Sequence, residues 1–254
     1  MALTIGTTKD PSARYIRALI YGPSGIGKTT SATTLPPDRT LIVSFERKLL
    51  PLAGKNYPLA VINSWGDLDD LRTMFQGGQP VRIDGREIKT IFIDSLTAMG
   101  ELGKRHIVET ARPDLIRAKT GGKKSTPDGI YDDQLDMKDW GKLASMLQSA
   151  IVAFTALPCN VIFTALEKAV NEHTRRIMLD GKVGQTAPMY FDLVFYMREL
   201  QGGGGRVWQT GITTEMDVFA KDASGVLDTF EKTDWPHVMR KLHDAQTTTT
   251  QKET

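Results

Sequence analysis

The sequence predicts an α/β fold in which helices cover both faces of a mostly parallel sheet. Apolar runs rich in β-branched residues alternate with amphipathic stretches along most of the 254 residues. Hydrophobic residues make up 40% and charged residues 24% of the chain, a globular balance that disfavours disordered, collagen-like and coiled-coil classes. The net charge is only +2, so any basic footprint for nucleic acid must be local.

The first elements form a βαβ unit. A strand is predicted from Tyr15 to Tyr21 and another from Thr40 to Phe45. The stretch Gly27 to Leu35 between them is typical of a helix, which the prolines that follow Leu35 would end.

The middle of the chain continues the alternation. Ser64 followed by Asp67 resembles a capping box, so a helix is expected from Trp65 to Phe75. Asp84-Gly85 lies between short β-prone runs and predicts a hairpin turn, followed by a strand from Thr90 to Ile93.

The segment from Leu102 to Met137 is polar, and residues 121–127 are its expected loop tip. Apolar spacing predicts a helix from Trp140 to Leu157, and Asn160 to Ala165 is typical of a buried strand. The remaining expected elements are short strands at Arg175–Leu179, Leu193–Met197, Arg206–Ile212 and Asp217–Ala220, and a helix at Trp235–Leu242. We expect residues 1–14 to be an N-terminal extension, residues 15–244 to be one domain, and residues 245–254 to be a disordered polar tail.

Compartment and disulfide content follow from simple features. The single cysteine, Cys159, excludes an internal disulfide. The sequence has no signal-peptide pattern and no apolar run of membrane-spanning length, so we expect a cytoplasmic protein without a membrane partner.

One motif carries specific chemistry. The segment from Gly22 to Thr29 satisfies G-x-x-x-x-G-K-[ST] and stands between a predicted strand and a predicted helix, as a phosphate-binding loop requires. Its glycines let backbone N–H groups converge on phosphate oxygens, and the helix N-terminus favours the anion. The expected ATP-binding residues are Gly22, Pro23, Ser24, Gly25, Ile26, Gly27, Lys28, Thr29 and Thr30. Lys28 is expected to reach the β- and γ-phosphates, and the Thr29 hydroxyl to bind Mg²⁺.

Carboxylates after two other strands complete the predicted site. Asp94 ends the apolar strand at Thr90–Ile93 and is expected to hold Mg²⁺, although an acidic helix cap is the alternative. Glu46 ends the strand after the phosphate-binding loop and is the candidate to activate water, or it is an ordinary solvated residue beside Arg47 and Lys48. Glu167, which follows a later strand, is the second candidate for this role.

These three elements, taken in order, resemble the ATPase core of RecA and Rad51-type recombinases. The size of the chain and its segment from Ala220 to Asp228 are more similar to compact phage-encoded AAA/RecA-like ATPases of the single-strand annealing type. The resemblance implies a RecA-like P-loop NTPase core with a mostly parallel central sheet and C-terminal antiparallel strands. It also implies Mg-ATP hydrolysis, with Lys28 and Glu46 as catalytic residues and Thr29 and Asp94 at the metal. Where RecA has a phosphate-sensing glutamine, this chain has Leu166, and Thr164 or Glu167 would have to substitute.

The resemblance further implies action on single-stranded DNA, self-association into a filament or ring, and a single-strand DNA-binding protein as a partner. Seven basic residues against two acidic ones between Lys104 and Thr126 would suit phosphate contact, or they form a solvated loop. The segment Lys168 to Lys182 is the second candidate for DNA contact. Arg198 and Arg206 are candidates to complete a neighbouring subunit's site. The alternatives are a P-loop nucleotide switch, a helicase or loader-type motor in DNA replication, and a small-molecule kinase.

Overall fold

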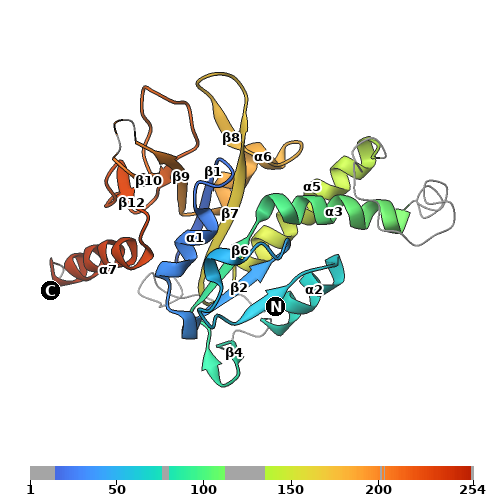
Figure 1. Ribbon diagram of the computed structural model, residues 1–254, viewed down its shortest axis with the longest axis horizontal. Helices are drawn as coiled ribbons and strands as arrows, with labels where there is room; N and C mark the ends of the chain where they lie inside the picture. The colour runs from blue at the N-terminus through green and yellow to red at the C-terminus, as the bar shows by residue number, and fades with distance from the viewer. Residues whose placement is uncertain (1–14, 76–79, 112–134, 201, 203, 253–254) are drawn as a thin grey trace.

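A twisted, mostly parallel sheet forms the centre of the computed structural model, which describes residues 15–75, 80–111, 135–200, 202 and 204–252 (Figure 1). In the described chain ten strands share this sheet. Six of them run parallel to one another, in the spatial order β9 (Leu193–Glu199), β1 (Arg17–Gly22), β7 (Asn160–Ala169), β6 (Thr90–Asp94), β2 (Thr40–Ser44) and β3 (Leu59–Val61). This confirms the predicted fold class.

Antiparallel strands extend the sheet beyond β9 and beside β7. They are β10 (Arg206–Gln209), β12 (Phe230–Lys232), β11 (Lys221–Asp222) and β8 (Arg175–Ile177). The strand predicted at Asp217–Ala220 is wrong, because Asp217 makes only an isolated bridge to Thr174 and the ladder begins at Lys221. A small second sheet pairs β4 (Arg82–Ile83) with β5 (Arg86–Glu87) around the predicted Asp84-Gly85 turn, whose two residues have φ of 49° and 77°.

Helices pack on both faces of the sheet because strand side chains alternate between them. Leu19 and Tyr21 of β1 belong to the core under one face, and Ile20 belongs to the core under the other. The helices are α1 (Lys28–Ser31), α2 (Trp65–Met74), α3 (Leu96–Ala111), α5 (Met137–Thr155), α6 (Val183–Thr186) and α7 (Trp235–Lys252). Helices α2, α3 and α5 cover the first face, and the second face is covered by α7 and the turn after α1 (Figure 1).

Helix α3 occupies residues for which we predicted no helix, and the loop tip expected at 121–127 lies outside the described residues. Its buried residues Leu96, Met99, Leu102 and Ile107 recur at helical spacing, and the Ser95 hydroxyl accepts a hydrogen bond from the Ala98 N–H at 3.1 Å. Ser95 therefore caps this helix, not Asp94, which leaves the Asp94 carboxylate for other contacts. Helix α5 begins three residues earlier than predicted, and Asp136 and Asp139 form its capping box.

Helix α7 continues to Lys252, through most of the segment that we expected to be a disordered tail. Extending a helix costs far less than starting one, so the packed first turns of α7 can support a polar continuation. Trp235 and Val238, both fully buried, anchor these turns against Trp208 of β10.

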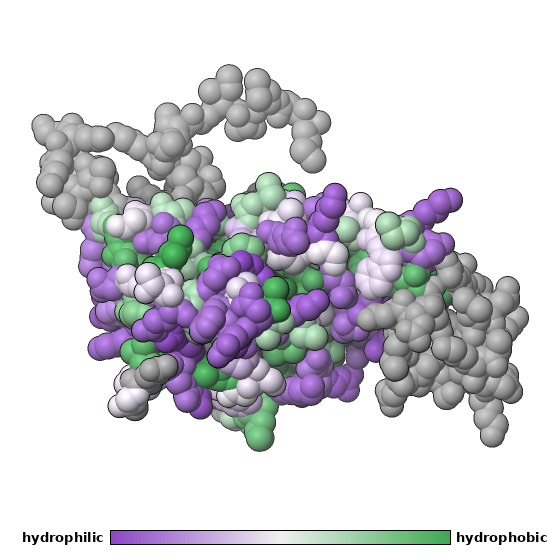
Figure 2. Space-filling model, turned by 90° about the horizontal axis from the view of Figure 1, so that it is seen from above, coloured by the Kyte–Doolittle hydropathy of each residue, from purple (hydrophilic) through white to green (hydrophobic). Residues whose placement is uncertain are grey.

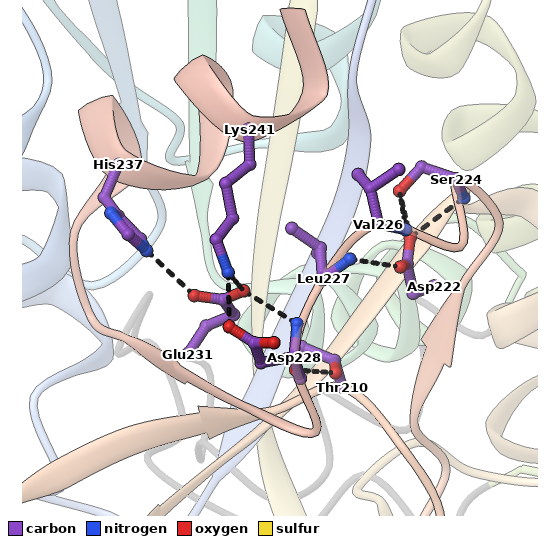
Figure 3. Close-up of polar contacts among 9 residues, drawn as sticks. All are labelled: Thr210, Asp222, Ser224, Val226, Leu227, Asp228, Glu231, His237 and Lys241. Carbon is purple, nitrogen blue, oxygen red and sulfur yellow. Dashed lines mark hydrogen bonds and ion pairs between the residues drawn. The ribbon is translucent and has the colours of Figure 1, made fainter. Parts of the chain in front are cut away.

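Polar contacts tie α7 to the strands that precede it (Figure 3). The buried carboxylate of Glu231 accepts hydrogen bonds from Lys241 Nζ at 2.6 Å and from the Asp228 N–H at 2.9 Å, and it lies 3.0 Å from His237 Nε2. Asp222 in the same region accepts from the backbone N–H groups of Ser224 and Leu227, which closes the turn after β11. A buried carboxylate is tolerated only with such partners.

The surface mixes hydrophilic side chains with small apolar groups (Figure 2). Within the described residues we find no helix with the length and apolarity needed to cross a bilayer. Cys159 is buried, and burial raises the pKa of its thiol to about 11, so it is a core residue. The expected extension at 1–14 lies outside the described residues.

Candidate functional site

The loop from Gly22 to Thr29 connects β1 to α1 at the carboxyl edge of the parallel strands. Gly25 and Gly27 have φ of 78° and 108°, which side-chain-bearing residues rarely adopt. At Gly22 a side-chain carbon would lie 2.5 Å from the carbonyl oxygen of Met197 on β9. Three of the predicted glycines are thus required by the backbone itself, two for conformation and one for space.

Lys28 begins α1 and is 8% exposed. Its ammonium donates to the carbonyl oxygens of Gly22 at 2.9 Å and Pro23 at 2.6 Å, so it lies folded against the loop. Burial lowers the pKa of Lys28 to about 8, and the nearby Asp94 opposes this shift.

Two hydroxyl groups hold the Asp94 carboxylate. Thr29 Oγ1 donates to Asp94 Oδ2 at 2.6 Å, and Thr164 Oγ1 donates to Asp94 Oδ1. Thr164 lies in β7, which separates the strand of Asp94 from the strand of the loop. From the sequence, Thr164 is a candidate only as a substitute for a sensor. A hydroxyl in an otherwise apolar buried run was the signal that could have suggested a polar partner.

Glu46 lies two residues beyond the end of β2 and lines the same cleft as Lys28 and Asp94. The cleft has a volume of about 330 Å³. The side chain of Glu46 is 49% exposed and forms an ion pair with Lys48 at 2.8 Å. Glu46 therefore reaches the expected edge of the sheet, but its carboxylate lies against a neighbouring ammonium.

The chemistry of the cleft fits a magnesium-bound triphosphate. Magnesium is commonly held by one or two protein oxygens together with phosphate oxygens and water. Thr29 and Asp94 supply such oxygens, and the lysine and backbone amides of the loop are suited to anions. Among the described residues there is no group of three or more His, Cys, Asp or Glu side chains that could hold a metal ion without a ligand's help.

Glu167, the second candidate for water activation, does not line this cleft, although its charge acts on the pKa of Lys28. Strand β7 extends to Ala169, so Glu167 lies inside the strand, and Leu166 is its neighbour that lines the cleft. Glu167 Oε1 lies 3.5 Å from Arg175 Nε, and burial raises the pKa of Tyr196, a shift to which the Glu167 carboxylate adds. Its carboxylate serves the β7–β8 hairpin.

The two arginines suggested for a neighbour's site differ in their surroundings. Arg198 is 9% exposed, and its guanidinium donates to Glu215 at 2.8 Å and Gln209 at 3.3 Å. It is thus held inside its own subunit. The side chain of Arg206 is 47% exposed and lies beside Gly27.

The segments suggested for DNA contact are only partly described. Most of the basic stretch, including Arg112, Arg117, Lys119, Lys123 and Lys124, lies outside the described residues. Lys104 is 3% exposed and forms ion pairs with Glu101 at 2.8 Å and Asp180 at 3.1 Å, so it is not presented to a ligand.

The β7–β8 hairpin carries the other candidate segment. Arg176 pairs with Asp217 at 2.5 Å and stacks over the Phe219 ring at 4.6 Å. Arg175 donates to the carbonyl oxygen of Asn171 at 2.6 Å. Both arginines thus stabilise the hairpin, while Lys168 and Lys182 are exposed.

The chain matches a known protein family. A family described as an AAA domain matches residues 14–224, which include the loop, Glu46, Asp94 and the β7–β8 hairpin. No curated protein matches the chain.

Proposed function

Because the chain belongs to the AAA domain family, we propose that it is a Mg-ATP-dependent ATPase that acts on single-stranded DNA in recombination or annealing. An AAA domain is an ATPase-type domain, so family membership already indicates nucleotide-dependent activity. The action on single-stranded DNA is what we propose in addition. The contact between Thr29 and Asp94, 2.6 Å apart on two different elements beside Lys28, carries the proposal.

The loop residues bind and orient the nucleotide in this proposal. Backbone N–H groups between Gly22 and Thr29 grip the phosphate oxygens. Lys28 exchanges its bonds to the Gly22 and Pro23 carbonyls for bonds to the β- and γ-phosphates. Phosphate contact favours the ammonium form, which offsets the burial that lowers its pKa.

Thr29 and Asp94 would hold the metal, with Thr164 as the positioning residue behind Asp94. Bound Mg²⁺ supplies positive charge that neutralises the phosphate oxygens during transfer to water. The two side-chain oxygens that would hold it, Thr29 Oγ1 and Asp94 Oδ2, already lie 2.6 Å apart.

Glu46 would orient the attacking water and accept its proton. It lines the cleft from the β2 side, and releasing Lys48 would free its carboxylate for this role. Because Glu46 is half exposed, that ion pair contributes little stability and is easily exchanged.

Support for DNA as the partner comes from the resemblance to RecA-type recombinases and from strand β7. This one strand carries Thr164, which donates to Asp94, and Leu166, which lines the cleft, and it continues into the hairpin with exposed Lys168. We further propose self-association on the strand, with a single-strand DNA-binding protein as a partner. Such a protein would work in the cytoplasm, of a bacterial host if it is phage-encoded.

A turnover assay tests the proposal. Purified wild-type protein should hydrolyse ATP faster with single-stranded DNA than without it, and Lys28→Ala should abolish both rates. Absence of binding to a labelled ATP analogue with Mg²⁺ would reject the ATPase assignment. Binding and turnover that DNA does not change would reject only the DNA substrate.

A nucleotide switch with little hydrolysis is a second candidate, and the Glu46–Lys48 ion pair favours it because it occupies the candidate base. Glu46→Gln separates the two functions. It should abolish turnover in the ATPase but leave ATP-dependent DNA or partner binding intact in the switch. A kinase would instead require an added acceptor for phosphate transfer.

A further inference from the structure

The guanidinium of Arg206 lies directly against the phosphate-binding loop. A side-chain carbon at Gly27 would be only 2.9 Å from Arg206 Nη1 and 3.8 Å from its Cδ. The arginine therefore occupies the space that the missing side chain of Gly27 leaves. Arg206 begins β10 and pairs with Glu199 at the end of β9, so both lie at the carboxyl edge of the sheet, level with the loop.

The sheet order decides which end of a nucleotide Arg206 faces. Strands β9 and β10 lie on one side of β1, while β7 and β6, which carry Thr164 and Asp94, lie on the other. The Thr29–Asp94 contact marks the side where Mg²⁺ and the terminal phosphates would be held. A triphosphate gripped by the loop in that orientation would direct its α-phosphate end away from β6 and β7, toward β9 and β10.

We propose that Arg206 binds the α-phosphate end of a nucleotide held in the cleft of its own subunit, not that of a neighbour. This inference rests on the proposed nucleotide binding and adds a contact to it from outside the loop motif. Arginine suits the role because its planar guanidinium can donate two hydrogen bonds to one phosphate.

The present partner of Arg206 is weak enough to be replaced. Its Nε lies 3.5 Å from Glu199 Oε1, and the two side chains are 47% and 66% exposed. Such an exposed pair contributes little by itself. A phosphate offers more negative charge and more acceptor oxygens than the Glu199 carboxylate, so the guanidinium can turn to it while its stem still packs beside Gly27.

Binding of ADP and ATP, measured by calorimetry with Mg²⁺, tests the proposal. Arg206→Ala should weaken the binding of both nucleotides by about tenfold, the scale of one lost charge-assisted hydrogen-bonding contact at a partly exposed site. The equal loss follows because the γ-phosphate is not involved. The control is Lys232→Ala, which removes an exposed cation from the adjacent strand β12 and should leave both affinities unchanged.

Glu199→Gln distinguishes a ligand role from a structural one. If Arg206 binds phosphate, removing its competing carboxylate should leave nucleotide affinity unchanged or slightly tighter. If the arginine only braces the hairpin through Glu199, this variant should weaken binding as Arg206→Ala does, and the proposal is wrong. Arg206→Lys, which keeps the charge but not the planar fork, should give an intermediate loss.

A mixing experiment tests whether the contact is made within one subunit. Lys28→Ala and Arg206→Ala proteins, mixed in equal amounts, should show no more turnover than the sum of the two alone. Recovered turnover would mean that the arginine is supplied by a neighbour and would overturn the proposal, as would wild-type ADP affinity in Arg206→Ala. If the wild type itself binds no nucleotide, the proposed function has failed instead.

Discussion

Replacing Thr164 by valine removes the hydroxyl that donates to Asp94 and keeps the size and branching of the side chain. Thr164 is fully buried in β7, so no water can readily take the place of its hydroxyl. The Asp94 carboxylate accepts hydrogen bonds from the hydroxyl groups of Thr29 and Thr164, and after the change only that from Thr29 remains.

The expected magnitude follows from these contacts. A hydrogen bond to a charged group is worth about 1.5–3 kcal/mol, and the more apolar valine recovers part of this, so we expect a net loss of about 1 kcal/mol in the free energy of unfolding. The functional loss should be larger. Removing a group that orients a metal-binding carboxylate commonly costs about 10- to 100-fold in metal affinity or activity.

The assay is ATP turnover as a function of Mg²⁺ concentration, with thermal unfolding measured on the same samples. Thr164→Val should need more Mg²⁺ for half-maximal turnover. Thr40→Val is the matched control, because Thr40 is also fully buried in the sheet, yet its hydroxyl has no hydrogen-bond partner among the described residues. That control should keep wild-type turnover and equal or exceed wild-type stability. A Thr164→Val protein with an unchanged Mg²⁺ requirement would refute the positioning role.

Three further predictions concern other groups. Burial lowers the pKa of Lys28 to about 8, so ATP binding above that pH must take up a proton. The dissociation constant should be nearly constant at lower pH and rise about tenfold per pH unit above it, whereas a flat profile in calorimetry would show that Lys28 stays charged. Glu231→Ala should lower the free energy of unfolding by about 3 kcal/mol, because it leaves the hydrogen-bond partners of a buried carboxylate without an acceptor. Urea denaturation measures this loss, and Glu231→Gln should lower the free energy of unfolding by less. Ser64→Ala removes the side-chain cap of α2 and should cost about 1 kcal/mol in the same assay, with no change in turnover. A loss of ATP turnover in Ser64→Ala would contradict a purely structural role for that cap.

Local signals were sufficient for β1, the phosphate-binding loop, β2 and the hairpin at Asp84-Gly85, but the helix predicted from Gly27 to Leu35 is an α-helix only over Lys28–Ser31, and a 3-10 turn follows it. Each depends on residues close in sequence, such as glycines with positive φ, and the same is true of α2 with its capping box. The helix after Asp94 was missed because polar residues between its apolar positions obscured a regular spacing. The extent of α7 was missed because composition alone does not show that a packed first turn supports the polar turns beyond it.

The functional site likewise has some residues that local motifs predicted and some contacts that only the folded sheet creates. The loop and the two strand-end carboxylates followed from motifs, and they lie at one cleft, although their catalytic roles stay predictions. The bond from Thr164 to Asp94 joins residues 70 positions apart, so only the register of β7 against β6 brings them together. The approach of Arg206 to Gly27 likewise depends on the pairing of β10 with β9, which no local pattern specifies.

Gly27 is subject to two requirements that have separate origins, and this shapes which suppressor mutations can exist. An alanine there would lie 2.9 Å from Arg206 Nη1, the end of a flexible side chain that would have to move, and it would also hold a side-chain-bearing residue at a φ of 108°. Moving or shortening Arg206 would relieve the close contact but not the dihedral strain, which no distant substitution can remove. A genetic selection starting from Gly27→Ala should therefore return revertants at codon 27 and few or no compensating changes on β10.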